Sequence, residues 1–344
     1  MNRAICVIVA CLAASPGYAQ DDKDTFEKRI PRSILGDGDD SFLTFTSEND
    51  LYGGGTDKNY TNGARVTWFD LGAEPPRLAE WLDRIVPSFR INETTSVYYS
   101  LGQNLYTPED ITAAVPDPND RPYAAFLYGS AGLTSVTDDH IDTIEFTLGV
   151  VGPWALGEPT QKAVHEWIGS PDPAGWDNQL ENEPGIILSF QRSWPEAYAA
   201  SPDPLYFRAI PHAGATLGNV YTYANVGLTL QLTPAADRWQ AQPLRVRPSI
   251  PGSGFFAPPS DTWSWALFAG VEGRAVGRNI FLDGNTFEDS PSVDKRPFVA
   301  DASAGLAFTL GTTRLSYTVN WRSREFDGQD EPSIFGAVGL GFRF

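Results

Sequence analysis

The chain has 344 residues, 42% of them hydrophobic, and a formal net charge of −18. This length is enough for one large β-domain or two ordinary domains. The acidic excess argues against nucleic acid as a partner, because phosphate backbones bind basic surfaces. After residue 19, no apolar run approaches the ~20 residues of a membrane helix, which leaves strands as the means of crossing a membrane.

Residues 1–19 have the pattern of a secretory signal peptide. A basic start at Arg3 precedes an apolar run and a small-residue cleavage site at Ala19. A lipobox ending at Cys11 is the alternative, but the apolar run before it is short. Both cysteines of the chain, Cys6 and Cys11, lie in this segment, so the exported protein is expected to contain no disulfide. Its formal charge would be −19, since Arg3 is the only charged residue removed.

Residues 20–40 are charged and aperiodic, which is typical of a flexible lead-in. Residues 41–344 are expected to form one β-domain, because period-2 alternation dominates them and turn residues separate the alternating segments. The candidate strands in chain order are 41–49, 60–72, 96–106, 121–136, 142–152, 185–194, 204–218, 220–232, 262–277, 296–311, 313–323 and 334–344.

Two features favour a membrane barrel over a secreted β-sandwich, which shares the same period. Many strands alternate a large apolar residue with a small one, as residues 263–271 do, and this suits a lipid face and a small-residue interior. The chain also ends on Phe344, with apolar residues at every second position before it. Its 10 Trp and 13 Tyr are typical of aromatic girdles at membrane interfaces. The sequence predicts an all-β, antiparallel transmembrane β-barrel of about 12 strands, monomeric, in the bacterial outer membrane.

One segment, residues 154–176, breaks the β pattern. Pro159 suits a first helical turn, and Gly169 then stops the run. The pattern predicts a helix of two to three turns near the barrel rim. Gln161 and His165 are four residues apart and therefore share one face of this helix.

The chain has three histidines, and their contexts differ. His140 lies in an acidic turn, where a solvated role is expected, and His212 lies in a strand, where it is expected to face the lumen. His165 is the candidate general base, because an imidazole needs only a fixed orientation and a nearby nucleophile. A structural role for His165 is the alternative.

The first strand ends on a polar cluster that includes Asn49 and Asp50. The glycines at 53–55 allow a tight turn beside this pair. Carboxylate, amide and backbone oxygens suit a hard cation such as Ca²⁺, although the spacing does not match an EF-hand loop. An acidic turn that only solvates the rim is the alternative.

Arg121 begins another strand, where its guanidinium can hold an anionic substrate group. A salt bridge to Asp117 or Asp120 is the alternative. The sequence has no Gly-x-Ser-x-Gly elbow, His-Glu-x-x-His helix or P-loop, so serine hydrolase, zincin and nucleotide-binding functions lack support.

These clusters, in this order, resemble the outer-membrane lipid A 3′-O-deacylase family. The matching segments extend across about half of the exported chain, and the sequence departs from the family pattern at Ala125, where a glycine is expected. The segments are 48–63, 102–111, 120–124, 148–169 and 175–185.

The resemblance implies a 12-stranded barrel with its active site near the outer-leaflet surface, partly under the short helix. It also implies hydrolysis of an ester-linked acyl chain of lipid A, the lipid part of lipopolysaccharide, with dependence on Ca²⁺. The family's helix histidine falls on His165, as the base that activates water. Its Asn-Asp pair falls on Asn49 and Asp50, which are expected to be catalytic with His165 and would orient the site or bind the cation, with Asp50 as the metal ligand.

Four further residues match motif positions of the family and are expected to bind the substrate or support the site: Arg121, Tyr60, Thr61 and Gln161. The alternatives are a non-catalytic barrel with a lipid-binding or structural role and a small porin. A porin predicts an open, water-filled lumen lined by charges, with His165 far from Asp50.

Overall fold

The computed structural model describes residues 40–53, 59–76, 89–92, 94–137, 139–237, 239–240, 242–246, 248, 252 and 254–344, without the side chains of 59–61. The predicted signal peptide and nearly all of the predicted lead-in lie outside these residues.

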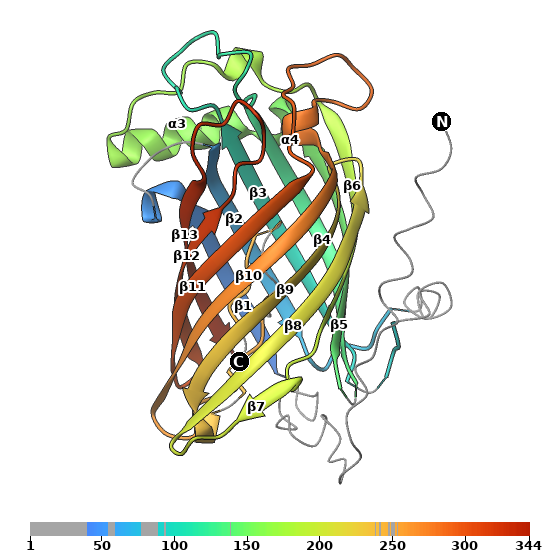
Figure 1. The fold of residues 1–344 in the computed structure, drawn as a ribbon, viewed down its shortest axis with the longest axis vertical. Coiled ribbons are helices and arrows are strands. Elements are labelled where there is room, and N and C mark those ends of the chain that lie inside the picture. Colours follow the sequence, from blue (N-terminus) through green and yellow to red (C-terminus); the bar gives the residue numbers. More distant parts are fainter. Residues whose placement is uncertain are drawn as a thin grey trace.

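The described chain forms one antiparallel sheet that closes into a barrel of twelve long strands (Figure 1). The ring closes because β1 pairs with β13 and β6 pairs with β8. The predicted fold class is therefore confirmed. The strands are β1 (Ser41–Asn49), β2 (Asn59–Asp70), β3 (Ser96–Thr107), β4 (Ala124–Val136), β5 (Ile141–Val151), β6 (Glu183–Ser193), β7 (Tyr198–Ala200), β8 (Leu205–Gly218), β9 (Tyr221–Pro234), β10 (Trp263–Asn279), β11 (Phe298–Leu310), β12 (Thr313–Arg322) and β13 (Ser333–Arg343).

The thirteenth strand, β7, is an addition that pairs only with β8. At three residues it is too short to show an alternating pattern, so the sequence does not predict it. The helical elements are α3 (Gly157–Ile168), α4 (Ile280–Asp283), and the 3₁₀ turns η3 (Asp50–Tyr52), η4 (Pro153–Ala155), η5 (Trp176–Asn178) and η6 (Ala235–Asp237). None of the helices in the described ranges is both long and apolar enough to span a membrane.

Alternation along each strand sorts side chains between the two faces of the wall. In β2, Arg65 and Thr67 point inward and are buried, whereas Val66 and Trp68 point outward and are exposed. In β10 the large residues of the alternating pattern, such as Trp263, also point outward. The outer face is thus apolar and the inner face polar, as a membrane barrel requires.

The polar inner face is held together by buried ion pairs. Arg65 contacts Glu145 at 2.5 Å, and Asp301 accepts hydrogen bonds from both Arg274 and Arg322 at 2.9 Å. Each of these buried charges has an opposite charge beside it, which offsets the free energy of desolvation.

The connection between β9 and β10 enters the lumen and follows the inner face of β1. The ring of Phe256 packs on Phe42 with centroids 5.4 Å apart, near the start of the strand. Near its end, Arg245 Nε donates to Glu48 Oε1 at 2.5 Å. In the part of the chain that the structure describes, this connection and the ion pairs occupy the lumen. The small-porin alternative predicts an open, water-filled lumen instead.

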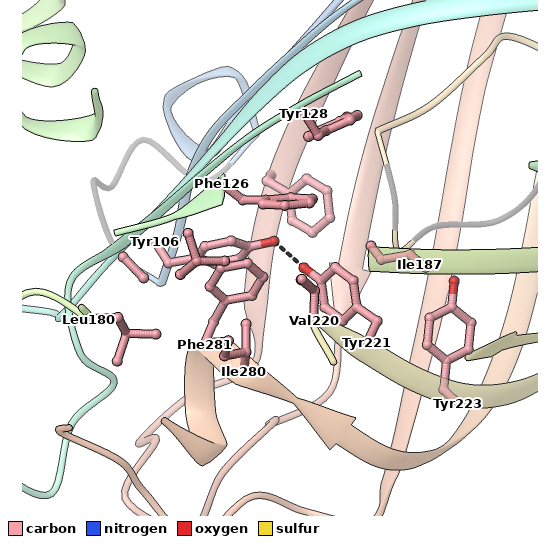
Figure 2. Close-up of a cluster of buried hydrophobic side chains, with 13 residues drawn as sticks. Tyr106, Phe126, Tyr128, Leu180, Ile187, Val220, Tyr221, Tyr223, Ile280 and Phe281 are labelled. Atoms are coloured by element: carbon pink, nitrogen blue, oxygen red, sulfur yellow. Dashed lines mark hydrogen bonds between the residues drawn. The ribbon is translucent and has the colours of Figure 1, made fainter. Parts of the chain in front are cut away.

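An aromatic cluster lies inside the barrel near the end that carries α3 (Figure 2). Tyr106 stacks on Phe281 with ring centroids 4.1 Å apart, and its hydroxyl is hydrogen-bonded to that of Tyr221. Phe126 also packs on Phe281. The cluster joins β3, β4, β9 and α4, and so stiffens the wall behind α3.

Candidate active site

A pocket lies on the outer surface of the barrel wall, between the wall and α3. Figure 1 shows α3 lying across the end of the barrel opposite to the C-terminus. The pocket, together with the open space at its mouth, has a volume of about 380 Å³. Its lining residues are Asn49, Leu51, Asn62, Leu105, Gln161, Val164, His165, Ile168 and Ser170.

The wall side of the pocket comes from outward-pointing residues at the ends of three neighbouring strands. Asn49 of β1 pairs in register with Asn62 of β2, and Asn62 pairs with Leu105 of β3. The ladder between β2 and β3 shifts register between Tyr60 and Asn62, which makes Thr61 the extra residue of a β-bulge. Bulges of this kind re-aim side chains next to active sites.

Hydrogen bonds and close packing anchor α3 on the wall. Gln103 Nε2 donates to the carbonyl oxygen of Ala155 at 2.7 Å and to Thr160 Oγ1 at 3.2 Å. A Cβ at Gly157 would lie 2.6 Å from that of Ala125 and 2.5 Å from the ring of Trp176. The alanine at 125 is therefore accommodated because the helix presents a glycine to it.

His165 is buried, and its ring orientation is fixed by the loop that follows α3. Its Nδ1 lies 2.6 Å from the carbonyl oxygen of Pro171. A carbonyl oxygen only accepts, so Nδ1 carries the hydrogen and the neutral ring has its lone pair on Nε2. Gly169, with φ of 75°, and Ser170 both donate backbone N–H groups to the His165 carbonyl oxygen and hold this loop in place.

Gln161 lies one turn before His165 on the same buried face, as their spacing predicts. Trp176 Nε1 donates to Gln161 Oε1 at 2.7 Å. An indole N–H only donates, so this contact fixes the orientation of the amide. Gln161 Nε2 is buried, and no hydrogen-bond partner for it is present in the described part of the chain. The pocket thus contains an oriented donor beside a candidate base.

Asn49 and Asp50 lie at the turn from β1 into η3, beside the pocket. Asn49 Oδ1 and Asp50 Oδ1 both accept from the backbone N–H of Leu51, at 2.8 and 2.9 Å. The two side-chain oxygens therefore converge on one point. Asn49 lines the pocket with His165, whereas the buried Asp50 lies just behind this lining.

The donor set is compatible with a hard cation. Within the described ranges, no three His, Cys, Asp or Glu side chains are grouped as a metal site. Asp50 supplies one carboxylate and Asn49 an amide oxygen, which is the chemistry that Ca²⁺ accepts when backbone, water and substrate oxygens complete its shell.

The remaining predicted site residues are Arg121, Tyr60 and Thr61. Arg121 is fully buried, with its NH2 nitrogen 3.3 Å from Glu325 Oε2 and its guanidinium 5.3 Å from the Tyr106 ring centroid. It does not line the pocket. Tyr60 and Thr61 belong to β2, but their side chains lie outside the described part of the structure.

The remaining histidines lie away from the pocket. His212 faces the lumen, with Nε2 3.2 Å from Glu272 Oε2. His140 lies in the β4–β5 turn. Burial lowers its pKa, but the combined effect of Asp142 and Asp139 is larger and opposite, so the pKa of His140 is raised above its usual value. Neither residue competes with His165 as the candidate base.

Sequence reasoning missed several parts of the pocket. Alternation along β2 does predict the direction of Asn62. It is three residues from Arg65, which points inward, so Asn62 points outward. Leu105 and Trp176 lie in the matching segments 102–111 and 175–185, but alternation does not predict their roles, which depend on the packing of α3 against the wall.

The fold and the pocket define a membrane β-barrel with an enzyme-like site on its outer wall. The family described as outer membrane protein LpxR matches residues 5–344, and the chain belongs to this family. The chain is thus an enzyme of the bacterial outer membrane, a lipid A deacylase, and the predicted family, enzyme class and location are confirmed.

Among the solved structures, one with the same fold is similar over most of its length. LpxR from Salmonella typhimurium matches with a TM-score of 0.70 and 21% identity, over 88% of this chain and 99% of that one. The β domain of the Bordetella autotransporter BrkA has a TM-score of 0.38 and 8% identity, over 89% and 97%. The translocator domain of NalP from Neisseria meningitidis has a TM-score of 0.37 and 11% identity, over 91% and 92%. A comparison with curated proteins gives no significant match.

Proposed function

We propose that the chain hydrolyses an ester-linked acyl chain of lipid A at the outer leaflet, in the pocket between α3 and the barrel wall. The observation that carries this proposal is the hydrogen bond from His165 Nδ1 to Pro171, which presents the basic nitrogen in a pocket on the lipid-facing wall. A barrel whose site faced the lumen would not give a membrane lipid this access.

In the proposed reaction, His165 Nε2 takes a proton from water as the water oxygen attacks the ester carbonyl carbon. The tetrahedral intermediate then collapses, and the bond to the sugar oxygen breaks. The imidazolium returns its proton to that oxygen, so the products are a fatty acid and a lipid with a free hydroxyl group. The Pro171 carbonyl stabilises the imidazolium by accepting from Nδ1.

Gln161 would stabilise the negative charge that develops on the carbonyl oxygen. Its Nε2 is an oriented and buried donor, and such donors are most effective where water is excluded. Trp176 positions this amide by binding its oxygen.

The Ca²⁺ ion expected from the family would be held by the side-chain oxygens of Asp50 and Asn49. When bound, it would supply Lewis-acid polarisation of the ester carbonyl. Tyr60 and Thr61, at the bulge, stay candidates for substrate contact. Arg121 has no part in the proposed reaction, because its guanidinium is buried against Glu325.

The test is to incubate the purified barrel with lipid A and Ca²⁺ and to follow product mass. We expect the wild type to remove one acyl unit and His165→Ala to lose at least about 10²-fold in rate, the usual contribution of a general base. His140→Ala is the matched control and should retain full rate. Equal rates for the wild type and His165→Ala, or no change in lipid mass with a folded barrel, would refute the proposal.

A further inference from the structure

The surface of α3 is divided into three strips. With 100° per residue, Gly157, Gln161 and His165 form one buried strip that faces the wall. The two flanks on either side of this strip differ in chemistry. One flank contains Glu158, Lys162 and Glu166, and the other contains Thr160, Val164 and Trp167.

The charged flank faces the outer loop and the water beyond it. Lys162 Nζ donates to Glu158 Oε1 at 2.6 Å across one turn of this flank. Glu158 raises the pKa of Lys162, and Asp172 and Asp177 of the loop after α3 add to the effect. Those two acids belong to the connection between α3 and β6.

The apolar flank faces the opposite way, toward the middle of the barrel. Thr160 lies on this flank and accepts from Gln103. Because β3 runs toward the α3 end, Gln103 lies about 6.6 Å farther from that end than Leu105, which lines the pocket. The flank that contains Thr160 is therefore the one directed along the wall toward the membrane.

The apolar flank is exposed although its residues are hydrophobic. Trp167 is 87% exposed, and Leu156 just before the helix is 54% exposed. Below Gln103 on the same face of β3 lie Leu101 and Tyr99, which are also exposed. In a water-soluble protein such a contiguous patch would be costly, and here it continues the lipid-facing band of the barrel.

We propose that α3 is an interfacial helix whose apolar flank contacts the acyl chains of outer-leaflet lipids, so that the pocket opens sideways into the hydrocarbon. Val164 of this flank also lines the pocket, as does Ile168, which lies between Val164 and Gln161 around the helix and is 44% exposed. They form the path along which an acyl chain reaches His165. The membrane contact is independent of the proposed hydrolysis, whereas the delivery of an acyl chain to His165 rests on it.

Site-directed spin labelling tests the membrane contact without an activity assay. Because both native cysteines precede residue 20, one introduced cysteine is unique in the exported barrel. Three variants are labelled and reconstituted in phosphatidylcholine vesicles: Trp167→Cys on the apolar flank, Lys162→Cys on the charged flank, and Leu101→Cys on the strand as the lipid-exposed reference. Power saturation then measures how often each spin label collides with oxygen, which concentrates in hydrocarbon, and how often it collides with a water-soluble nickel chelate.

We expect the label at 167 to resemble the label at 101, with oxygen collisions dominant, and the label at 162 to favour the nickel chelate. Equal, nickel-dominated accessibility at 167 and 162 would overturn the proposal. Each variant must also migrate as a folded barrel without heating in a denaturing gel, so a misfolded label site is recognised.

Kinetics separate this proposal from the proposed function. Trp167→Glu should raise the apparent KM for lipid A in vesicles about tenfold while kcat is retained, and Lys162→Gln should change neither; tenfold corresponds to about 1.4 kcal/mol. Lipid contact at 167 in a barrel that hydrolyses nothing would refute only the hydrolase. Hydrolysis with nickel-dominated accessibility at 167, or an unchanged KM in Trp167→Glu, would refute the interfacial path.

Discussion

Glu48 and Asn49 are neighbours in β1, yet they lie on opposite faces of the barrel wall. On the inner face, Glu48 accepts from Arg245 Nε at 2.5 Å and from the backbone N–H of Val246 at 3.0 Å. On the outer face, Asn49 lines the pocket with His165. A single step along a strand thus separates a tightly paired structural charge from a side chain available to a substrate.

The two faces differ in what their polar groups contact. The inner face uses its charges on one another, as in the contacts of Arg274 and Arg322 with Asp301, and this makes the wall stiff. The outer pocket retains the buried donor of Gln161 for a ligand. In the proposed function, the lumen supports the site and the chemistry takes place on the lipid side.

Breaking the inner pair is expected to have the largest effect. Arg245→Met would leave the Glu48 carboxylate buried without its charged partner, which destabilises a protein by about 3–5 kcal/mol. Urea unfolding of the barrel in detergent measures the loss. Combining it with Glu48→Gln should restore most of the stability, and a double variant no more stable than Arg245→Met would contradict the pairing.

Removing the Gln161 donor from the pocket on the outer face should lower the catalytic rate more than the stability of the fold. Gln161→Met removes Nε2 from the pocket and should lower kcat by about 10²-fold with little change in KM, as for loss of an oxyanion donor. Gln191→Met, on the inner face, is the matched control and should retain the rate. If KM rises and kcat is unchanged, Gln161 binds the ground state and does not stabilise the transition state.

Overpacking the contact between α3 and the barrel wall is expected to have a smaller effect. Gly157→Ala places a Cβ 2.5 Å from Trp176 and 2.6 Å from the Cβ of Ala125, an overpacking that costs about 1–3 kcal/mol. Rate and thermal stability should both fall. Adding Ala125→Gly should recover part of each, and the absence of any recovery would show that Trp176 alone sets the clash.

The smallest effect is expected at His140, which belongs to neither face. Its pKa is raised in the folded barrel by Asp142 and Asp139 despite the opposing effect of burial. A raised pKa stabilises the fold at pH below the unfolded value, and this stabilisation is lost as pH rises through the folded value. His140→Asn should therefore reduce stability slightly at pH 5 and not at pH 9. A reduction of equal size at both pH values would contradict the ion pair.

The sequence by itself determined the alternating strands, and through them the barrel and the face on which each strand residue lies. It also determined α3 and the shared face of Gln161 and His165, because both follow from short-range periodicity. The motif order indicated the family, and the family match confirmed it.

Only the tertiary structure decided which polar groups meet. Glu48 and Arg245 are 197 residues apart, and Arg121 and Glu325 are 204 apart, so no local pattern predicts that these charges pair. The same holds for the β9–β10 connection inside the lumen, whose residues have no alternating pattern that marks them as buried. Periodicity reports the direction of a side chain, whereas its partner depends on how the sheet closes and on what packs against each face.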